Sequence, residues 1–317
     1  MNMKWIEARV NYIAGDGLLG ADVVADLFYG LGLHGVLLED PDLPIDPDGS
    51  SDGQPTTASH AVVGYIPVNA GSRKRCDELR GRLRQLEFPT RLTLREIDDR
   101  DWAQFWKSHF KPLTVCPGLT ITPSWENLPA RGGETVVEID PGMAFGTGHH
   151  PTTLLCLQLL RSCLQAGDTL LDVGTGSGIL AIAAVKSGSG RVIAVDSDET
   201  AIVVAKENRR RNRIGPDRLE LVCGSLTDPV KGRFKAVVAN ILPHVVMELL
   251  ERLDQVLEPA GLFIASGIPD EKADAVIRKA KSRSVETFTV RSMDGWTAFA
   301  ARLTDAAPDR KTAVESG

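Results

Sequence analysis

A short glycine-rich segment contains the residues best suited to chemistry. Asp172, Gly174, Gly176 and Gly178 follow the pattern D-x-G-x-G-x-G, directly after the apolar run 169–173. Glycines at this spacing favour a tight turn from a strand into a helix, where a ligand can contact the backbone at the carboxyl end of the strand. We therefore expect a binding site here. The alternative is a plain turn that binds nothing.

The glycine spacing also indicates which ligand would bind. A dinucleotide site would follow G-x-G-x-x-G and present a helix N-terminus to a pyrophosphate. Here one residue separates each pair of glycines, and Asp172 precedes the turn, where its carboxylate could meet a positive ammonium group. The pattern favours a positively charged nucleoside without phosphates. S-adenosylmethionine fits that description better than NAD.

Asp196 is the second candidate, because it ends the next apolar run and lies 22 positions after Gly174. At that spacing, an acidic side chain can accept both hydroxyl groups of a ribose. The alternative role is the N-cap of the following helix. Ser197 and Asp198 can fill that role equally well, which leaves Asp196 available for a ligand.

Residues 140–153 read DPGMAFGTGHHPTT and lead into an apolar helix. The glycines around Thr147 indicate a loop that packs closely over a ligand, and the ring of Phe145 could cover a cation. His149 and His150 could be metal ligands, but adjacent residues do not easily share one metal and no acidic partner stands at ligand spacing. We therefore predict a cofactor loop and no metal.

Two further segments carry polar residues of interest. Asn240 ends an apolar run, at the place where α/β sheets bind ligands, although it could simply end the strand. The run 209–213, RRRNR, is the one dense basic segment, and cations at the end of a helix complement the helix dipole. A solvated helix end is the favoured interpretation of that run, and binding to RNA the lesser one.

The composition is that of an ordinary globular protein. The chain has 317 residues, with 36 Lys plus Arg against 42 Asp plus Glu, a net charge of −6 and 43% hydrophobic residues. That length supports two domains, and the charge argues against a nucleic-acid coat. No apolar run is long enough to cross a bilayer, and five cysteines without a C-x-x-C pair argue against disulfides and zinc. We expect a cytoplasmic protein.

The first part of the chain predicts a small α+β domain over residues 1–98. Expected strands and helices alternate in the order βαββαβ, which is typical of a ferredoxin-like sandwich. The strands are expected at 4–10, 35–39, 60–67 and 91–97, and the helices at 18–31 and 72–87. Residues 39–59 contain six acidic residues and no basic ones, which indicates a solvated insertion.

Residues 99–126, with prolines at 112, 117 and 123, are expected to link this domain to a larger one at 127–304. Short apolar runs alternate there with helical segments, which predicts an α/β, doubly wound, seven-stranded sheet whose last two strands form a hairpin. The strands are expected at 169–173, 191–195, 219–223, 235–239, 261–266, 285–290 and 296–303. A flexible tail is expected at 305–317.

Together these residues resemble the class I S-adenosylmethionine-dependent methyltransferases, and more narrowly the PrmA family, which methylates the eleventh protein of the large ribosomal subunit. The narrower resemblance rests on residues 145–153, FGTGHHPTT, and on residues 240–242, NIL. The segments around Trp106, 110–112 and 121–126 resemble the linker of that family. The similarity covers nearly the whole chain.

This resemblance implies a transfer of methyl groups from S-adenosylmethionine to lysine side chains and the N-terminal amine of that ribosomal protein. The amino-terminal domain would recognise the ribosomal protein. Asn240 would contact the cofactor and orient the acceptor amine. The other residues implied at the cofactor are Thr153, Asp172, Gly174, Gly176, Gly178 and Asp196, with Phe145 and Thr147 closing over its methionine end.

Two features depart from the family pattern, the acidic insertion at 39–59 and Pro243-His244 after the NIL segment. Both bear on docking of the substrate. Other functions stay open at this point: a methyltransferase of the same fold acting on lysine of another protein, a small amine or RNA; an NAD-dependent oxidoreductase, which the glycine spacing disfavours; and a non-catalytic module that binds the cofactor or the ribosome.

Overall fold

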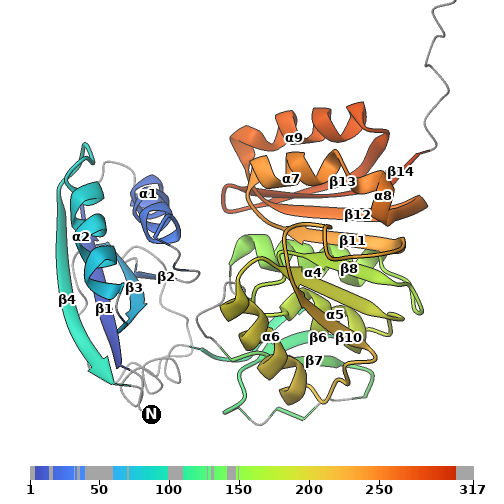
Figure 1. Ribbon diagram of the computed structural model, residues 1–317, viewed down its shortest axis with the longest axis horizontal. Coiled ribbons are helices and arrows are strands. Elements are labelled where there is room, and N and C mark those ends of the chain that lie inside the picture. Colours follow the sequence, from blue (N-terminus) through green and yellow to red (C-terminus); the bar gives the residue numbers. More distant parts are fainter. Residues whose placement is uncertain are drawn as a thin grey trace, which may run out of the picture. The chain divides into compact units, whose positions relative to one another are not determined.

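The computed structural model describes residues 4–13, 17–31, 33, 36–39, 60–69, 71–98, 110–126, 128–129, 132–140, 148 and 150–304 (Figure 1). The chain divides into two compact units, residues 1–110 and 111–317. Apart from Glu39, the predicted acidic insertion lies outside the described residues, and so does the predicted tail at 305–317.

The first unit has the predicted ferredoxin-like order. Its sheet runs β2-β3-β1-β4, and every neighbouring pair is antiparallel. Strands β1 and β2 are parallel to each other on either side of β3, as the split βαβ arrangement requires. The elements are β1 (Lys4–Tyr12), α1 (Gly17–Tyr29), β2 (Val36–Glu39), β3 (Ala61–Pro67), α2 (Ser72–Leu83) and β4 (Thr90–Asp98).

Both helices of this unit contribute to one hydrophobic core. Phe28 of α1 and Leu79 of α2 are fully buried in the same cluster as Val10 and Ile66 of the sheet. Gly64 of β3 lies directly under the Phe28 ring, because a Cβ built at this glycine would stand 2.5 Å from Cδ1 of that ring. The absence of a side chain at this position therefore lets α1 approach the sheet.

The predicted linker at 99–126 is shorter than expected, because its second half belongs to the second unit. Strands β5 (Leu113–Cys116) and β6 (Leu119–Thr122) form a hairpin, and β6 pairs in parallel with β7 (Thr135–Glu138). Leu119 and Ile121 are buried in the core of the larger unit. The prolines suggested a spacer, but these apolar side chains and the turn at Gly118, where φ is 81°, make a packed element.

The second unit contains the predicted seven-stranded, doubly wound sheet, in the order β10-β9-β8-β11-β12-β14-β13. All neighbouring strands are parallel except β14, which is antiparallel to both β12 and β13. The strands are β8 (Leu170–Val173), β9 (Val192–Asp196), β10 (Leu219–Cys223), β11 (Phe234–Asn240), β12 (Leu257–Pro269), β13 (Val285–Met293) and β14 (Trp296–Leu303).

Helices cover both faces of this sheet (Figure 1). Leu170 of β8 packs with α4 and α5, whereas the next residue, Leu171, packs with α7, α8 and α9. The strand order reverses at β8, so ligands are expected at the carboxyl ends of β8 and its neighbours. The helices are α4 (Pro151–Cys163), α5 (Ile179–Lys186), α6 (Glu199–Arg211), α7 (Pro243–Leu250), α8 (Leu253–Val256) and α9 (Asp270–Ser282).

No helix in the described part of the chain combines the length and apolar character needed to cross a membrane. No group of three or more His, Cys, Asp or Glu side chains there could hold a metal ion. All five cysteines are free thiols, and burial raises the pKa of the Cys156 thiol.

The contact between Gly64 and Phe28 generates a stability prediction. Gly64→Ala would force a methyl group into the Phe28 ring, and we expect it to lower the free energy of unfolding by about 1–3 kcal/mol. Gly81→Ala is the matched control, because nothing lies within 4 Å of a Cβ built at that position in α2, and alanine there should stabilise by roughly 0.5–1 kcal/mol. Urea denaturation of both variants measures the difference; equal stabilities would contradict the close contact.

Candidate functional site

The glycine segment forms the predicted turn between β8 and α5. Gly174, Gly176 and Gly178 have φ values of 74°, 54° and 83°, a region that side chains disfavour. A Cβ built at Gly174 would lie 2.3 Å from Cγ2 of Ile241, and one at Gly178 would lie 3.2 Å from Cβ of Ala205. Glycine is therefore required both by the backbone conformation and by close neighbours.

The backbone N–H groups of this turn are used inside the protein. Those of Gly174 and Thr175 donate to the carbonyl of Val195, at 2.8 and 3.0 Å. The N–H of Gly176 donates to the carboxylate of Asp196 at 2.8 Å, and that of Gly178 donates to the Thr175 carbonyl at 2.9 Å. A phosphate cradle would need such groups free and pointing at the ligand. The turn therefore does not suit a pyrophosphate, which argues against the NAD alternative.

Asp172 lies beneath the turn and is fully buried. Its Oδ2 accepts hydrogen bonds from the Thr175 hydroxyl at 2.6 Å and from the Ala181 N–H at 3.2 Å. Its Oδ1 is buried and finds no hydrogen-bond partner among the described residues. Burial raises the pKa of this carboxyl to about 7, partly offset by the hydrogen bonds from Thr175 and Ala181. The side chain thus ties the turn to the first turn of α5.

Asp196 ends β9 beside the glycine turn, as predicted from its spacing. Its Oδ2 accepts from Gly176 N–H, and its Oδ1 accepts from Asp198 N–H at 3.0 Å. Each carboxylate oxygen has two lone pairs, so both can still accept one ligand hydroxyl. The N-cap of α6 is Asp198, whose side chain accepts from Thr200 N–H at 2.7 Å. The helix cap and the candidate ribose ligand are therefore different residues.

Asn240 and Thr153 come together from distant parts of the chain. Thr153 is fully buried in the first turn of α4, and its hydroxyl oxygen accepts from Asn240 Nδ2 at 3.3 Å. This bond orients the amide at the end of β11. The other amide atom, Oδ1, is buried without a partner in the described part of the chain. A buried carbonyl without a hydrogen bond is costly, so it points to a ligand that donates one.

His150 has a role that sequence reasoning missed. It is the N-cap of α4, where its Nδ1 accepts from Thr152 N–H at 3.3 Å and lies 2.7 Å from the Thr152 hydroxyl. Its ring meets that of Trp296 edge to face, with 5.1 Å between centroids. Burial lowers the pKa of the imidazole to about 4, so the ring is neutral near pH 7. The position directly before Pro151, the first residue of α4, was the available signal.

The remaining candidates of this segment, Phe145, Thr147 and His149, lie outside the described residues. Gly148 is described and buried, with φ of 95°. A Cβ there would stand 2.6 Å from Cδ1 of Ile121. The chain thus enters α4 by packing against β6, the strand that sequence analysis assigned to the linker.

The described residues define what this site can bind. It offers buried or half-buried acceptor atoms: the two Asp196 oxygens, Asn240 Oδ1 and Asp172 Oδ1. The backbone donors of the turn are already committed. A ligand rich in hydrogen-bond donors and positive charge, and free of phosphate, fits this set. That is the chemistry expected from the D-x-G-x-G-x-G spacing.

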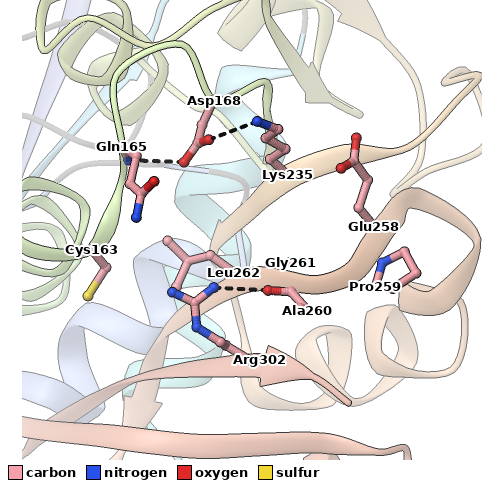
Figure 2. Close-up of a pocket in the computed structure, with 10 residues that line it drawn as sticks. All are labelled: Cys163, Gln165, Asp168, Lys235, Glu258, Pro259, Ala260, Gly261, Leu262 and Arg302. Carbon is pink, nitrogen blue, oxygen red and sulfur yellow. Dashed lines mark hydrogen bonds and ion pairs between the residues drawn. The ribbon is translucent and has the colours of Figure 1, made fainter. Parts of the chain in front are cut away.

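A cavity of about 220 Å³ lies at the opposite edge of the sheet, where β8 and β11 begin (Figure 2). Three of its four charged side chains have partners within the described part of the protein. Lys235 Nζ lies 3.7 Å from Asp168 Oδ1, and Arg302 donates to the Ala260 carbonyl at 2.9 Å. Because the carboxyl ends of the strands lie elsewhere, this cavity does not belong to the candidate site.

Comparison with known proteins agrees with this chemistry. The family model described as "Ribosomal protein L11 methyltransferase (PrmA)" matches residues 5–304. A ribosomal protein L11 methyltransferase of Pelotomaculum thermopropionicum is 38% identical, over 95% of this chain and 99% of its own length. One of Desulforapulum autotrophicum is 37% identical, over 95% of this chain and its full length.

A solved structure gives the same similarity. The crystal structure of a ribosomal protein L11 methylase from Lactobacillus delbrueckii subsp. bulgaricus is 32% identical to this chain, with a TM-score of 0.58. The match covers 62% of this chain and 100% of that one.

The buried carboxyl of Asp172 generates a prediction on pH dependence. Its pKa in the folded state, about 7, lies above the ordinary value of 3.8, so its contribution to stability is complete below about pH 4 and is lost as the pH rises through 7. Asn stays neutral throughout. We expect Asp172→Asn to exceed the parent protein in free energy of unfolding above pH 7, by on the order of 2 kcal/mol, and the difference to shrink toward pH 4.

Urea denaturation in steps from pH 4 to pH 8 measures this difference, with no ligand added. A difference that stays constant over the range would show that Asp172 does not titrate there.

Proposed function

The chain belongs to the PrmA family of ribosomal protein L11 methyltransferases, and on that premise we propose that it methylates amino groups of protein L11 in its own large ribosomal subunit. The amino groups are those of lysine side chains and the N-terminus. The observation that carries the proposal is the buried Asn240 Oδ1, an acceptor without a partner in the described residues, directly before Ile241, whose side chain packs against Gly174 of the glycine turn. An amine N–H supplies the donor that this atom lacks.

The methyl donor of this enzyme is S-adenosylmethionine. When bound, it supplies a methyl group on a positive sulfur, which an amine can attack in line. We assign the ribose hydroxyls to Asp196 and the close backbone approach to Gly174, Gly176 and Gly178. We assign the buried Oδ1 of Asp172, which has no hydrogen-bond partner among the described residues, to the positive end of the cofactor. These assignments rest on two observations. Backbone N–H groups of the turn already donate within the protein, whereas the carboxylate oxygens beside it can still accept hydrogen bonds.

The acceptor amine must be neutral to attack. A lysine with a pKa near 10.4 is mostly protonated at pH 7, whereas an N-terminal amine near 8 needs less help. Burial beside a positive group favours the neutral amine. Asn240 Oδ1 then accepts an N–H and aims the nitrogen lone pair, while Thr153 holds the amide in that orientation. His150 Nδ1 is occupied in the helix cap, so we infer that the proton leaves to water before transfer.

The first unit is assigned to recognition of the ribosomal protein. This unit has its own sheet and its own hydrophobic core, distinct from those that carry the candidate cofactor site, so a separate role in recognition can be assigned to it. A ribosomal substrate also places the enzyme in the cytoplasm. Neither recognition of the ribosomal protein nor a cytoplasmic location requires direct binding of the enzyme to nucleic acid.

The proposal is tested with the purified enzyme, labelled S-adenosylmethionine and unmethylated large-subunit proteins. We expect label in L11 alone, with mass increases of whole methyl groups located at lysines or the N-terminus. Label in another protein, in RNA or in a small amine would replace the proposed substrate by that class. Cofactor binding without any labelled product would indicate a non-catalytic module.

The role of Asn240 generates a kinetic prediction. Asn240→Ala removes an acceptor for the amine N–H, and we expect it to slow the first transfer by about tenfold, the effect of one hydrogen bond. A dimethylated neutral amine has no N–H left, so the last transfer should slow much less. A mass-spectrometric time course of each methylated species measures both rates.

Asn240→Asp is the matched control, because it keeps an acceptor oxygen at the same place. Thr153→Val should act in the same direction as Asn240→Ala, since it removes the hydroxyl that orients the amide. Equal slowing of all transfers in Asn240→Ala would refute the orienting role.

A further inference from the structure

Helix α6 meets the candidate site at several points, although none of its residues was a sequence-based candidate for binding the cofactor. It begins at Glu199, three residues after Asp196, with Asp198 as its N-cap. Two turns further on, Ala205 packs against Gly178, where a Cβ would stand 3.2 Å from that of Ala205. The helix packs beside α5 and β9 in the second unit (Figure 1). The position of α6 therefore affects both the glycine turn, which it contacts, and Asp196, which immediately precedes its N-terminal segment.

Asn208, in the last turn of α6, is 1% exposed and joins two separate segments. Its Nδ2 donates to the Ser177 carbonyl at 2.9 Å, within the glycine turn. Its Oδ1 accepts from the Asp140 N–H at 3.4 Å. Asp140 is the last described residue before segment 141–147, which contains Phe145 and Thr147. One buried amide thus connects the turn to the start of the second predicted cofactor segment.

We propose that Asn208 is a positioning residue for the cofactor, because it fixes the Ser177 peptide relative to Asp140. Ser177 lies between Gly176 and Gly178, which both have positive φ and little intrinsic resistance to rotation. The N–H of Gly176 must also stay aligned with Asp196. A side-chain hydrogen bond to the Ser177 carbonyl restricts this part of the turn. The inference rests on the proposed function, since it concerns the same cofactor site.

Other contacts hold Asp140 independently of Asn208. Its carboxylate accepts from the N–H and hydroxyl of Ser124, at 2.7 and 2.8 Å, and pairs with Arg211 at 3.1 Å. Loss of the Asn208 side chain therefore leaves Asp140 anchored through its own carboxylate. The glycine turn loses its bond from α6. The effect of the substitution should accordingly be concentrated at residues 174–178.

Asn212 provides a matched control on the same face of α6. It is 8% exposed, and its amide binds the backbone of Glu138 at 2.9 and 2.6 Å and also accepts from Lys186 at 3.0 Å. It makes no hydrogen bond to the glycine turn among those found in the described residues. The Asn212 Nδ2 also donates to the Asn208 carbonyl at 2.8 Å, so Asn212→Ala removes a buried amide of the same type with four hydrogen bonds against the two of Asn208, without touching Ser177.

The experiment measures binding of S-adenosylhomocysteine, the demethylated product, by calorimetry to the full-length protein. We expect Asn208→Ala to weaken binding by about tenfold, the effect of one buried hydrogen bond. Hydrogen exchange of the amides of residues 174–178, measured without ligand, should be faster in this variant. Asn212→Ala should lower the melting temperature at least as much as Asn208→Ala, yet leave both the affinity and the exchange of the turn near those of the parent.

Asn208→Asp separates the donor and acceptor functions of the amide, because it keeps an acceptor for the Asp140 N–H and lacks a donor for the Ser177 carbonyl. It should weaken binding at least as much as Asn208→Ala, and it serves as the test if the alanine variant does not fold. Equal affinity in parent and Asn208 variants, or equal losses in the Asn208 and Asn212 variants, would overturn the positioning role. Failure of the parent protein itself to bind S-adenosylhomocysteine would instead overturn the proposed function.

Discussion

One constraint organises the second unit: backbone N–H groups of the glycine turn donate hydrogen bonds to other parts of the protein. The Val195 carbonyl takes two of these N–H groups, and the Asp196 carboxylate takes a third. This arrangement keeps the turn folded against β9 and brings the carboxylate to its edge. Asn208 from α6 and Asp172 from below hold the same few residues. A site built this way presents oxygen acceptors, and so it selects donors and cations over phosphates.

Local patterns were sufficient to predict the sheet, the glycine turn and the position of Asp196 at the end of β9, because the residues that decide these features lie close together in sequence. The D-x-G-x-G-x-G spacing favoured a tight turn, and all three glycines have positive φ in it. The features that were missed depend on distant partners. Asn208 meets Asp140 across 68 positions, and no spacing rule connects them. The hairpin β5–β6 was taken for a linker because its prolines outweighed the two apolar residues that pack on α4 and α5.

For Asn240, at the end of β11, the sequence alone supplied only part of the argument for a ligand site. Its position after an apolar strand indicated a ligand site, but the strand could equally have ended there without function. The structure adds the second half of the argument, because Thr153, 87 positions earlier, binds the amide nitrogen and leaves the oxygen without a partner in the described residues. His150 supports the same helix start through its cap. The polar side chains at the end of β11 and the start of α4 therefore orient one another through hydrogen bonds.

The double hydrogen bonding of Asp196 has a consequence for the thermodynamics of recognition. A flexible carboxylate would lose rotamer freedom each time it gripped a sugar, and that loss would weaken binding. Here the backbone N–H groups of Gly176 and Asp198 hold the carboxylate in place by hydrogen bonds within the protein. In the role proposed for Asp196 at the ribose, the conformational entropy of its side chain is therefore lost on folding, and ligand binding does not incur that loss a second time.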